Sequence, residues 1–320
     1  MTLPWKRRAL ALVVGPALVA GAATISVGGT LATAPAASAY DRSALSGDRE
    51  AVLDRPFADS SPWNTRIPAG ADFRSTSVFR GDAGWVNLNE SSIPVYFGTW
   101  SDPAVTVRTP RGTFKMRAPT SLSPVSGSDR TVTVVDLTTR SVYDFWQFYR
   151  SGGTSFGASL GIQTSLDGAG FGSGRTKAGV RSSGASALGG LITGANLRDG
   201  RIDHALAIAA SSADLSGSFI APAVSTDSGA KYSNRGSLPM GSRIGIPPGT
   251  PKPAGLSRIG SMVWDAFSEY GGYLVDRTGG FALFADPKSV SQGDVDPLHA
   301  WWDGGSDLQL IIPRLQVVAG

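Results

Sequence analysis

Short runs of β-favouring residues, separated by glycine and proline turns, dominate most of the sequence. Of the 320 residues, 41 are Gly and 20 are Pro, and turns this frequent leave little room for long helices. Two pairs of runs, 104–107 with 113–117 and 131–135 with 142–149, enclose short turn segments and predict β-hairpins. Many short strands with few helices predict a mainly β fold, a β-sandwich of jelly-roll type with one or two short helices.

The one strong helical pattern spans residues 258–270. Its apolar residues recur at helical spacing, Ser257 can cap its start, and Gly271 can end it. A shorter helix is predicted at 185–192, where two glycines lower the helix propensity. Further strands are expected at 93–99, 201–209, 243–246, 273–276, 281–284, 308–312 and 315–318.

Residues 1–39 have the three parts of an export signal. Cationic residues at 6–8 come first, residues 9–31 are apolar, and an Ala-Ser-Ala cleavage site follows. The alternative, a transmembrane anchor, is disfavoured because glycines and a proline interrupt the apolar stretch before the cleavage site. The sequence therefore predicts a secreted protein whose mature chain begins at Tyr40 and does not stay inserted in a membrane.

The mature chain is close to neutral and lacks the residues of several functional classes. Cleavage would remove three cations and no carboxylate, lowering the net charge from +4 to +1, so we expect no nucleic-acid partner. The chain has no cysteine and only 2 His, which excludes disulfides, thiolate metal sites and a multi-histidine zinc site. We expect no metal or other cofactor. We interpret residues 40–55 as a loose leader and 56–320 as a single domain, and the oligomeric state stays open.

The densest aromatic segment, residues 142–149, holds the first candidate site residues. In a strand, Asp144 and Trp146 would share one face. A tryptophan ring can stack on the apolar face of a sugar, and an acid beside it can serve a hydroxyl or the glycosidic oxygen. Gln147 is a further candidate for sugar binding. The alternative is an ordinary sandwich strand with one aromatic core face.

Residues 200–209 combine an acid, a histidine and a row of alanines. As a strand, this segment would place His204 in an apolar row on one face and Asp203 beside the alanines on the other. His204 could act as a general acid or base, with its pKa set by burial and a neighbouring carboxylate. The alternative is a satisfied core histidine. Because adjacent strand residues point apart, each of the two would need another partner.

Residues 270–277 and one upstream arginine supply the remaining candidates. Two glycines permit a tight helix-to-strand turn that Tyr270 precedes and Tyr273 follows, and Asp276 ends the short strand beyond it. The tyrosines are candidates for sugar binding, and Arg243 could anchor a substrate carboxylate. The alternatives are a helix cap with a turn acid and, for Arg243, a structural ion pair.

Five motifs together resemble a family of secreted actinobacterial proteins. They are SPWN at 61–64, YDFWQ at 143–147, GRIDHAL at 200–206, PMGSR at 239–243 and YGGYLVD at 270–276. The resemblance covers about 59–280. That family is largely uncharacterised, so the resemblance implies export and one shared domain and assigns no catalytic residue.

The leading functional prediction is a secreted glycan-active enzyme, a glycoside hydrolase that acts on an extracellular or cell-wall polysaccharide. Asp144 and Asp203 would form the acid/base or acid/nucleophile pair, with Asp276 in reserve. The chain offers few glutamates outside the leader, so aspartates are the better candidates for this chemistry.

Two alternatives belong to other classes. A polysaccharide lyase acting on a uronic-acid glycan would use His204 as the base, Tyr270 as the acid and Arg243 to neutralise the uronate carboxylate. A non-catalytic cell-wall or carbohydrate-binding protein would bind a polysaccharide without turning it over.

Overall fold

The computed structural model describes residues 47–75, 79, 81–299 and 305–319. The predicted export signal, residues 1–39, and the start of the predicted leader lie outside the described residues. All described residues belong to one compact unit, Tyr40–Gly320.

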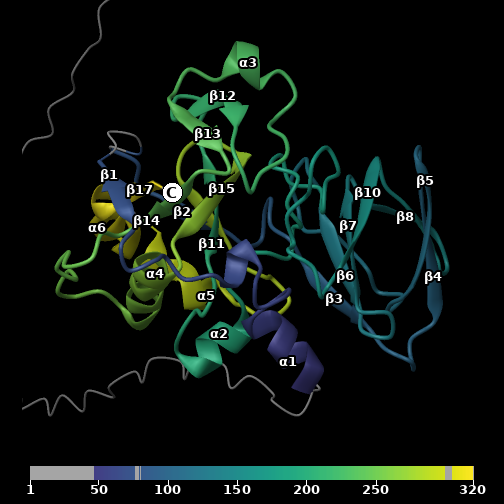
Figure 1. The fold of residues 1–320 in the computed structure, drawn as a ribbon. Coiled ribbons are helices and arrows are strands. Elements are labelled where there is room, and N and C mark those ends of the chain that lie inside the picture. The colour runs from purple at the N-terminus through teal and green to yellow at the C-terminus, as the bar shows by residue number, and fades with distance from the viewer. Residues whose placement is uncertain (1–46, 76–78, 80, 300–304, 320) are drawn as a thin grey trace, which may run out of the picture. The chain divides into compact units, whose positions relative to one another are not determined.

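The largest sheet has seven strands (Figure 1). Its strands follow the order β1 (Asp72–Arg74), β17 (Gln316–Ala319), β14 (Arg243–Gly245), β15 (Gly272–Arg277), β11 (Leu206–Ala210), β16 (Ala282–Phe284) and β2 (Trp85–Asn87). The pairs β11·β15 and β16·β2 are parallel, and the other pairs are antiparallel. Strands distant in sequence therefore meet side by side in this sheet.

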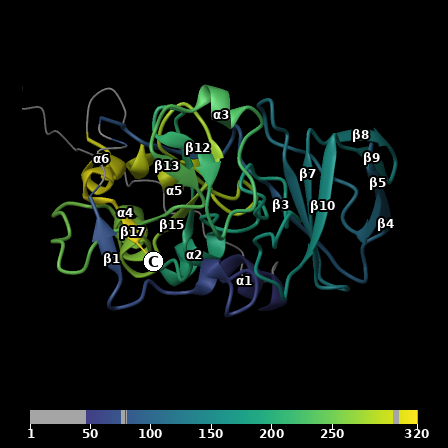
Figure 2. The same cartoon turned by 45° about the horizontal axis from the view of Figure 1, so that its top comes forward.

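Two four-stranded sheets and a two-stranded ribbon complete the β structure (Figures 1 and 2). The first sheet has the order β10 (Leu160–Ser165), β7 (Ser141–Trp146), β6 (Val132–Asp136) and β3 (Val95–Gly98). The second has the order β5 (Gly112–Arg117), β4 (Ala104–Thr109), β9 (Ser155–Gly157) and β8 (Tyr149–Gly152). The ribbon pairs β12 (Leu215–Phe219) with β13 (Leu238–Met240). Both predicted hairpins are confirmed as the antiparallel pairs β4·β5 and β6·β7.

Helices are short and connect or cover the sheets. They are α1 (Gly47–Asp54), α2 (Gly194–Asp199), α3 (Ala230–Ser233), α4 (Arg258–Glu269), α5 (Gln292–Val295) and α6 (Asp307–Ile311), with single 3-10 turns at η2 (Pro62–Asn64), η3 (Asp296–Leu298) and η4 (Ile312–Arg314). Helix α4 is the predicted one, and Ser257 caps it by accepting a hydrogen bond from the Gly260 amide at 3.1 Å.

The described residues form three hydrophobic cores, which lie on and between the sheets. One covers one face of the seven-stranded sheet, where Ile208 of β11 packs in the same cluster as Phe267 of α4. The opposite face carries the predicted row of alanines, and its cluster includes Ala207 and Val142 of β7. A third core fills the space between the two four-stranded sheets with side chains such as Phe156. Each fully buried large apolar side chain contributes about 1.5–3 kcal/mol to folding.

The mainly β class with few short helices is confirmed. The jelly-roll strand order is not, because β11·β15, β16·β2 and β3·β6 are parallel pairs, whereas a jelly roll is built from antiparallel strands.

Three local expectations were wrong. The predicted strand at 308–312 is mainly helix α6, and no helix forms at 185–192. Residues 47–54 of the predicted leader form α1, whose Leu53 is buried and whose Glu50 pairs with Arg198 of α2 at 2.9 Å. This part of the predicted leader is therefore packed against the domain.

Candidate functional site

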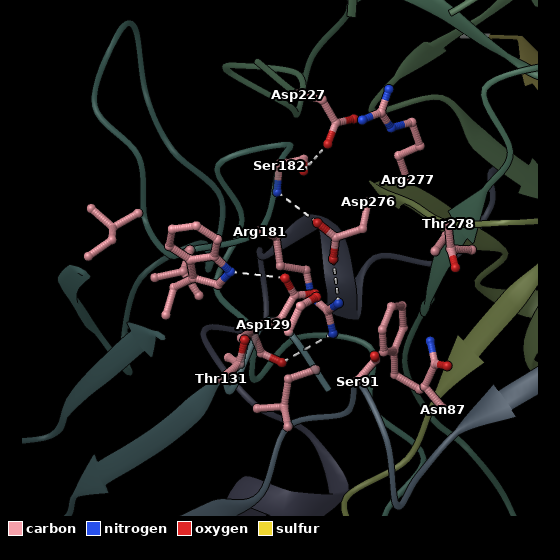
Figure 3. Close-up of a pocket in the computed structure, with 18 of the residues that line it drawn as sticks. Asn87, Ser91, Asp129, Thr131, Arg181, Ser182, Asp227, Asp276, Arg277 and Thr278 are labelled. Carbon is pink, nitrogen blue, oxygen red and sulfur yellow. Dashed lines mark hydrogen bonds and ion pairs between the residues drawn. The ribbon is translucent and has the colours of Figure 1, made fainter. Parts of the chain in front are cut away.

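A pocket of about 540 Å³ opens between the seven-stranded sheet and the sheet that contains β7. The first sheet contributes side chains such as Asn87 and Asp276, and the second contributes Trp146 and Leu160. Figure 3 shows the polar side chains that meet there. A concave site of this size with converging polar groups is the usual setting for a small-molecule or substrate site.

Asp276, at the end of β15, is the most heavily bonded carboxylate of the pocket (Figure 3). Its Oδ2 pairs with Arg181 Nη1 at 2.7 Å, and its Oδ1 accepts the Ser182 backbone N–H at 2.8 Å. Arg181 is almost fully buried, with its guanidinium 4.1 Å from the centre of the Phe284 ring. Burial raises the pKa of the Asp276 carboxyl above its ordinary value, and Arg181 and the Ser182 N–H act in the opposite direction.

A second carboxylate lies beside this ion pair. The Ser182 hydroxyl donates to Asp227 Oδ1 at 2.7 Å, so one residue connects Asp227 to Asp276 through its side chain and its backbone. Ser225 donates from its hydroxyl to the Ser182 carbonyl at 2.6 Å. Ser182 is thus tied to its neighbours through its backbone N–H, its hydroxyl and its carbonyl.

The side of the pocket formed by the β7 sheet carries an indole and a third carboxylate. Trp146, the last residue of β7, donates from Nε1 to Asp129 Oδ1 at 3.0 Å. Asp129 is exposed and Trp146 is half-buried. This bond fixes the orientation of the indole and places an acceptor next to it.

The pocket is suited to a ligand rich in hydroxyl groups. Besides the Arg181–Asp276 pair, its lining holds two carboxylates, Asp129 and Asp227, and two cations, Lys177 and Arg277. Hydroxyls can donate to the first and accept from the second. Over the described residues, no group of three or more His, Asp or Glu side chains could hold a metal ion.

Of the predicted site residues, Trp146 and Asp276 line this pocket. Asp144 lies next to it but has no exposed surface. Its Oδ1 accepts from the Thr133 hydroxyl and its Oδ2 from the Ala187 N–H, both at 2.7 Å. Burial raises the pKa of the Asp144 carboxyl. A ligand in the pocket cannot touch it.

The structure corrects the predicted pairing of Asp144 with Asp203. Asp203 does not line the pocket, and it pairs with Arg201 at 2.7 Å in the segment before β11. The strand expected at 201–209 begins only at Leu206, so the alternation of faces does not apply to residues 201–205. The two carboxylates therefore share no cavity that could hold a glycosidic bond.

His204 is fully buried and also lies outside the pocket. Its Nδ1 is 3.0 Å from the Ala205 carbonyl oxygen and its Nε2 is 3.4 Å from Asn196 Oδ1. Burial lowers its pKa, which favours the neutral ring at pH 7. These are the contacts of a satisfied core histidine.

Arg243 and the two tyrosines form a packed structural group. Arg243 Nε donates to the Tyr270 carbonyl at 2.9 Å, and its guanidinium lies 5.5 Å from the Tyr273 ring centre. Both tyrosines are buried, and Tyr273 meets Trp63 edge-to-face at 5.7 Å. None of the three lines the pocket. The arginine bonds backbone carbonyls where we expected a substrate carboxylate or an ion pair.

Gln147 is likewise outside the pocket lining. It adopts a φ of 53°, which ends β7, and its Oε1 accepts from the Ser159 hydroxyl at 2.6 Å. The backbone turn at Gln147 moves Phe148 into the core that contains Phe145, although strict alternation would place Phe148 on the face of Trp146.

Three charged residues of the pocket, Arg181, Asp129 and Asp227, were not among the predicted site residues. Arg181 lies in a run rich in small residues that we expected to be loops, with Arg175 and Lys177 nearby, so nothing in the local sequence distinguishes it. Asp129 and Asp227 sit in polar turns with no distinguishing pattern. Their role depends on contacts between distant segments.

Comparisons with family models, curated proteins and solved structures gave no match for this chain. Within the described residues, no helix is both long enough and apolar enough to span a membrane.

Proposed function

We propose that the protein is a secreted glycan-active enzyme, a glycoside hydrolase, and that the pocket between the two sheets is its substrate site. The observation that supports this most is the convergence of Trp146, Asp276 of β15 and the loop carboxylates Asp129 and Asp227 on one polar pocket of about 540 Å³. An aromatic face and hydroxyl-binding carboxylates are the groups a sugar requires.

Asp276 is the proposed proton donor. Its burial raises the pKa of the carboxyl, so more of the acid form is available at a given pH than for an exposed aspartate. Asp129, from the segment before β6, is the proposed second carboxylate, and Trp146 holds it through the indole N–H. These two replace Asp144 and Asp203 as the carboxylates of the proposed reaction.

A second candidate, a non-catalytic glycan-binding protein, is favoured by the Arg181–Asp276 ion pair. A cation at 2.7 Å and a backbone N–H at 2.8 Å both stabilise the ionised carboxylate. A carboxylate kept in that form accepts hydrogen bonds from hydroxyls and donates no proton. The two candidates share the pocket and differ only in turnover.

Product release from a panel of neutral and uronic polysaccharides separates them. Reducing ends and the ultraviolet absorbance of unsaturated sugars would be read together. We expect release of reducing ends that falls at least about 100-fold in Asp276→Asn and in Asp129→Asn. Asp203→Asn, which changes a carboxylate outside the pocket, is the matched control and should retain activity.

Three other outcomes would favour a different function or a different site. Binding without any turnover would favour the non-catalytic candidate. New ultraviolet absorbance would point to a lyase. If Asp203→Asn loses activity and Asp276→Asn retains it, this pocket is not the substrate site.

A further inference from the structure

One wall of the pocket is a tight loop, residues 178–187, hereafter the 178–187 loop. It closes on itself through hydrogen bonds from the Ala178 N–H to the Gly184 carbonyl and from the Gly184 N–H to the Arg181 carbonyl, both at 2.8 Å. Arg181, Ser182 and Ala187 from this loop line the pocket. The position of the loop therefore sets the shape and charge of the site.

The tip of the loop is held from the side of the seven-stranded sheet. Arg181 and Ser182 bind the two oxygens of Asp276, and the Ser183 N–H donates to the Val275 carbonyl at 2.9 Å. Each of these contacts requires the tip of the loop to lie at one position along β15. The far end of the loop must therefore be held as well, so that the tip keeps this position.

Asp144 provides that anchor from the other sheet. Its Oδ2 accepts the Ala187 N–H at the end of the loop, and its Oδ1 is fixed by the Thr133 hydroxyl of the neighbouring strand β6. The carboxylate thus links β6, β7 and the loop. It does this without reaching the pocket, since it has no exposed surface.

The loop rests directly on this carboxylate at Gly179. A Cβ atom built at Gly179 would lie 2.3 Å from Asp144 Oδ2 and 2.2 Å from Ser186 Cα. Both distances are far below van der Waals contact. Only glycine allows the loop to pack against Asp144 at this separation.

We propose that Asp144 is a positioning residue that sets the 178–187 loop so that Arg181 and Ser182 reach Asp276. The geometric part of this assignment stands without any substrate. Its consequence for turnover rests on the proposed function.

Burying a carboxylate in the core costs folding free energy. Burial disfavours its charged form, and an apolar side chain of similar volume is often at least as stabilising. What the carboxylate adds here is direction, because its two oxygens accept from two specific donors on different segments. That is the property required to fix a loop in register with a strand.

The test follows the titration of the Asp276 carboxyl by NMR in the purified protein. Arg181→Met removes the cation that lowers the Asp276 pKa, while the carboxylate of Asp227 remains nearby. We expect the midpoint of the Asp276 titration to rise by about one pH unit or more in Arg181→Met. Asp144→Ala should produce a rise in the same direction, because the displaced loop no longer presents Arg181.

Two further variants separate positioning from general destabilisation. Asp144→Asn keeps an oxygen for the Ala187 N–H and an NH2 for the Thr133 oxygen, so it should leave the Asp276 midpoint near that of the wild type. Gly179→Ala keeps Asp144, but its Cβ would clash with Ser186 Cα at 2.2 Å and the Ala185 carbonyl at 2.5 Å as well as with Asp144. It therefore displaces the loop itself, and it should raise the midpoint as Asp144→Ala does. If Asp144→Ala does not fold, Asp144→Leu gives the same test, because leucine fills the volume and accepts neither hydrogen bond.

The outcomes are distinct from those of the proposed function. An Asp276 midpoint that moves in Arg181→Met but in neither Asp144→Ala nor Gly179→Ala would overturn the positioning role. An unchanged midpoint in Arg181→Met would overturn the ion pair on which it depends. If a glycan is turned over, kcat/KM should fall in Gly179→Ala and stay near the wild-type value in Asp144→Asn. If no glycan is turned over, the titration result still tests the positioning role.

Discussion

Aspartate side chains tie loops to strands at three places in this protein. Two of them, Asp144 and Asp286, are buried, and the third, Asp276, is half-buried. Asp286 is the example outside the pocket. It accepts the Val95 and Lys288 N–H groups at 3.1 and 3.0 Å and the Ser289 hydroxyl at 2.6 Å. Each carboxylate satisfies donors that no regular strand or helix would satisfy.

Asp286 makes the stability of the protein depend on pH. Burial raises the pKa of its carboxyl from 3.8 to about 6. Because the folded form binds the proton more tightly, this group stabilises the fold fully below pH 3.8, and its contribution is lost as the pH rises through about 6. The shift corresponds to about 3 kcal/mol in the free energy of unfolding.

Asp286→Asn isolates this effect. Asparagine keeps an oxygen for the two backbone N–H groups and offers its NH2 to the Ser289 oxygen. We expect the unfolding free energy of the wild type, relative to the variant, to increase by up to about 3 kcal/mol from pH 7 to pH 4 in urea titrations. A difference that stays constant or decreases over this range would contradict the assigned burial.

At the residue scale, the sequence predicted part of the site for a physical reason. Trp146 is the last residue of β7 and Asp276 lies next to the end of β15, in two strands that the patterns predicted, although the first was expected to continue to residue 149. Both residues line the pocket between the two sheets. Asp203 and His204 precede their strand, and face alternation carries no information there. Arg181 could not be placed, because its partner Asp276 is 95 residues away.

At the element scale, helix α4 is held by one side chain that serves two helices. Ser257 Oγ accepts the Gly260 N–H at 3.1 Å and donates to Asp307 Oδ2 of α6 at 2.5 Å. The Ser257 N–H also donates to Asp307, at 3.2 Å. The cap of α4 and the start of α6 are therefore one hydrogen-bonded unit.

Ser257→Ala should destabilise the protein by about 1–2 kcal/mol in urea unfolding. The variant leaves the Gly260 N–H without its cap and takes a donor from Asp307. Ser261→Ala, one turn further into α4, is the matched control, and alanine there should be neutral or slightly stabilising. Equal effects of the two substitutions would show that the cap contributes nothing.

Local chemistry also explains which elements the sequence predicted. In the two hairpins, the turn residues and the flanking β-favouring runs predict the same structure. In α4, the capping residue and the helical spacing of the apolar residues do so. Residues 308–312 were expected to be a strand, but Ser306 and Gln309 form a capping box that starts a helix. Leu308 and Ile311 are buried while Leu310 is exposed, which is the helical period. The box was the signal that distinguishes the two structures.

At the scale of the whole molecule, the pocket is a product of sheet packing. The alanine face of β11 and Val142 of β7 share one core. Polar residues at or near the ends of the strands, such as Asn87 and Asp276, line the space next to it. Parallel pairs such as β11·β15 join strands separated by more than 60 residues, so no local pattern specifies them. The mainly β class could be read from the sequence, and the arrangement that creates the pocket could not.

If the pocket is a glycan site, its aromatic face should be required for binding, and this can be measured directly. Trp146→Ala removes the aromatic face from the pocket. Trp100→Ala removes a tryptophan that is 75% exposed and does not line the pocket, which makes it the matched control.

The measurement is calorimetric titration of wild type and both variants with the neutral and uronic polysaccharides of the panel. We predict that the wild type binds at least one of them, that Trp146→Ala weakens this binding at least about tenfold, and that Trp100→Ala leaves it unchanged. Unchanged binding in Trp146→Ala, or a wild type that binds none of the polysaccharides, would show that this pocket is not a glycan site.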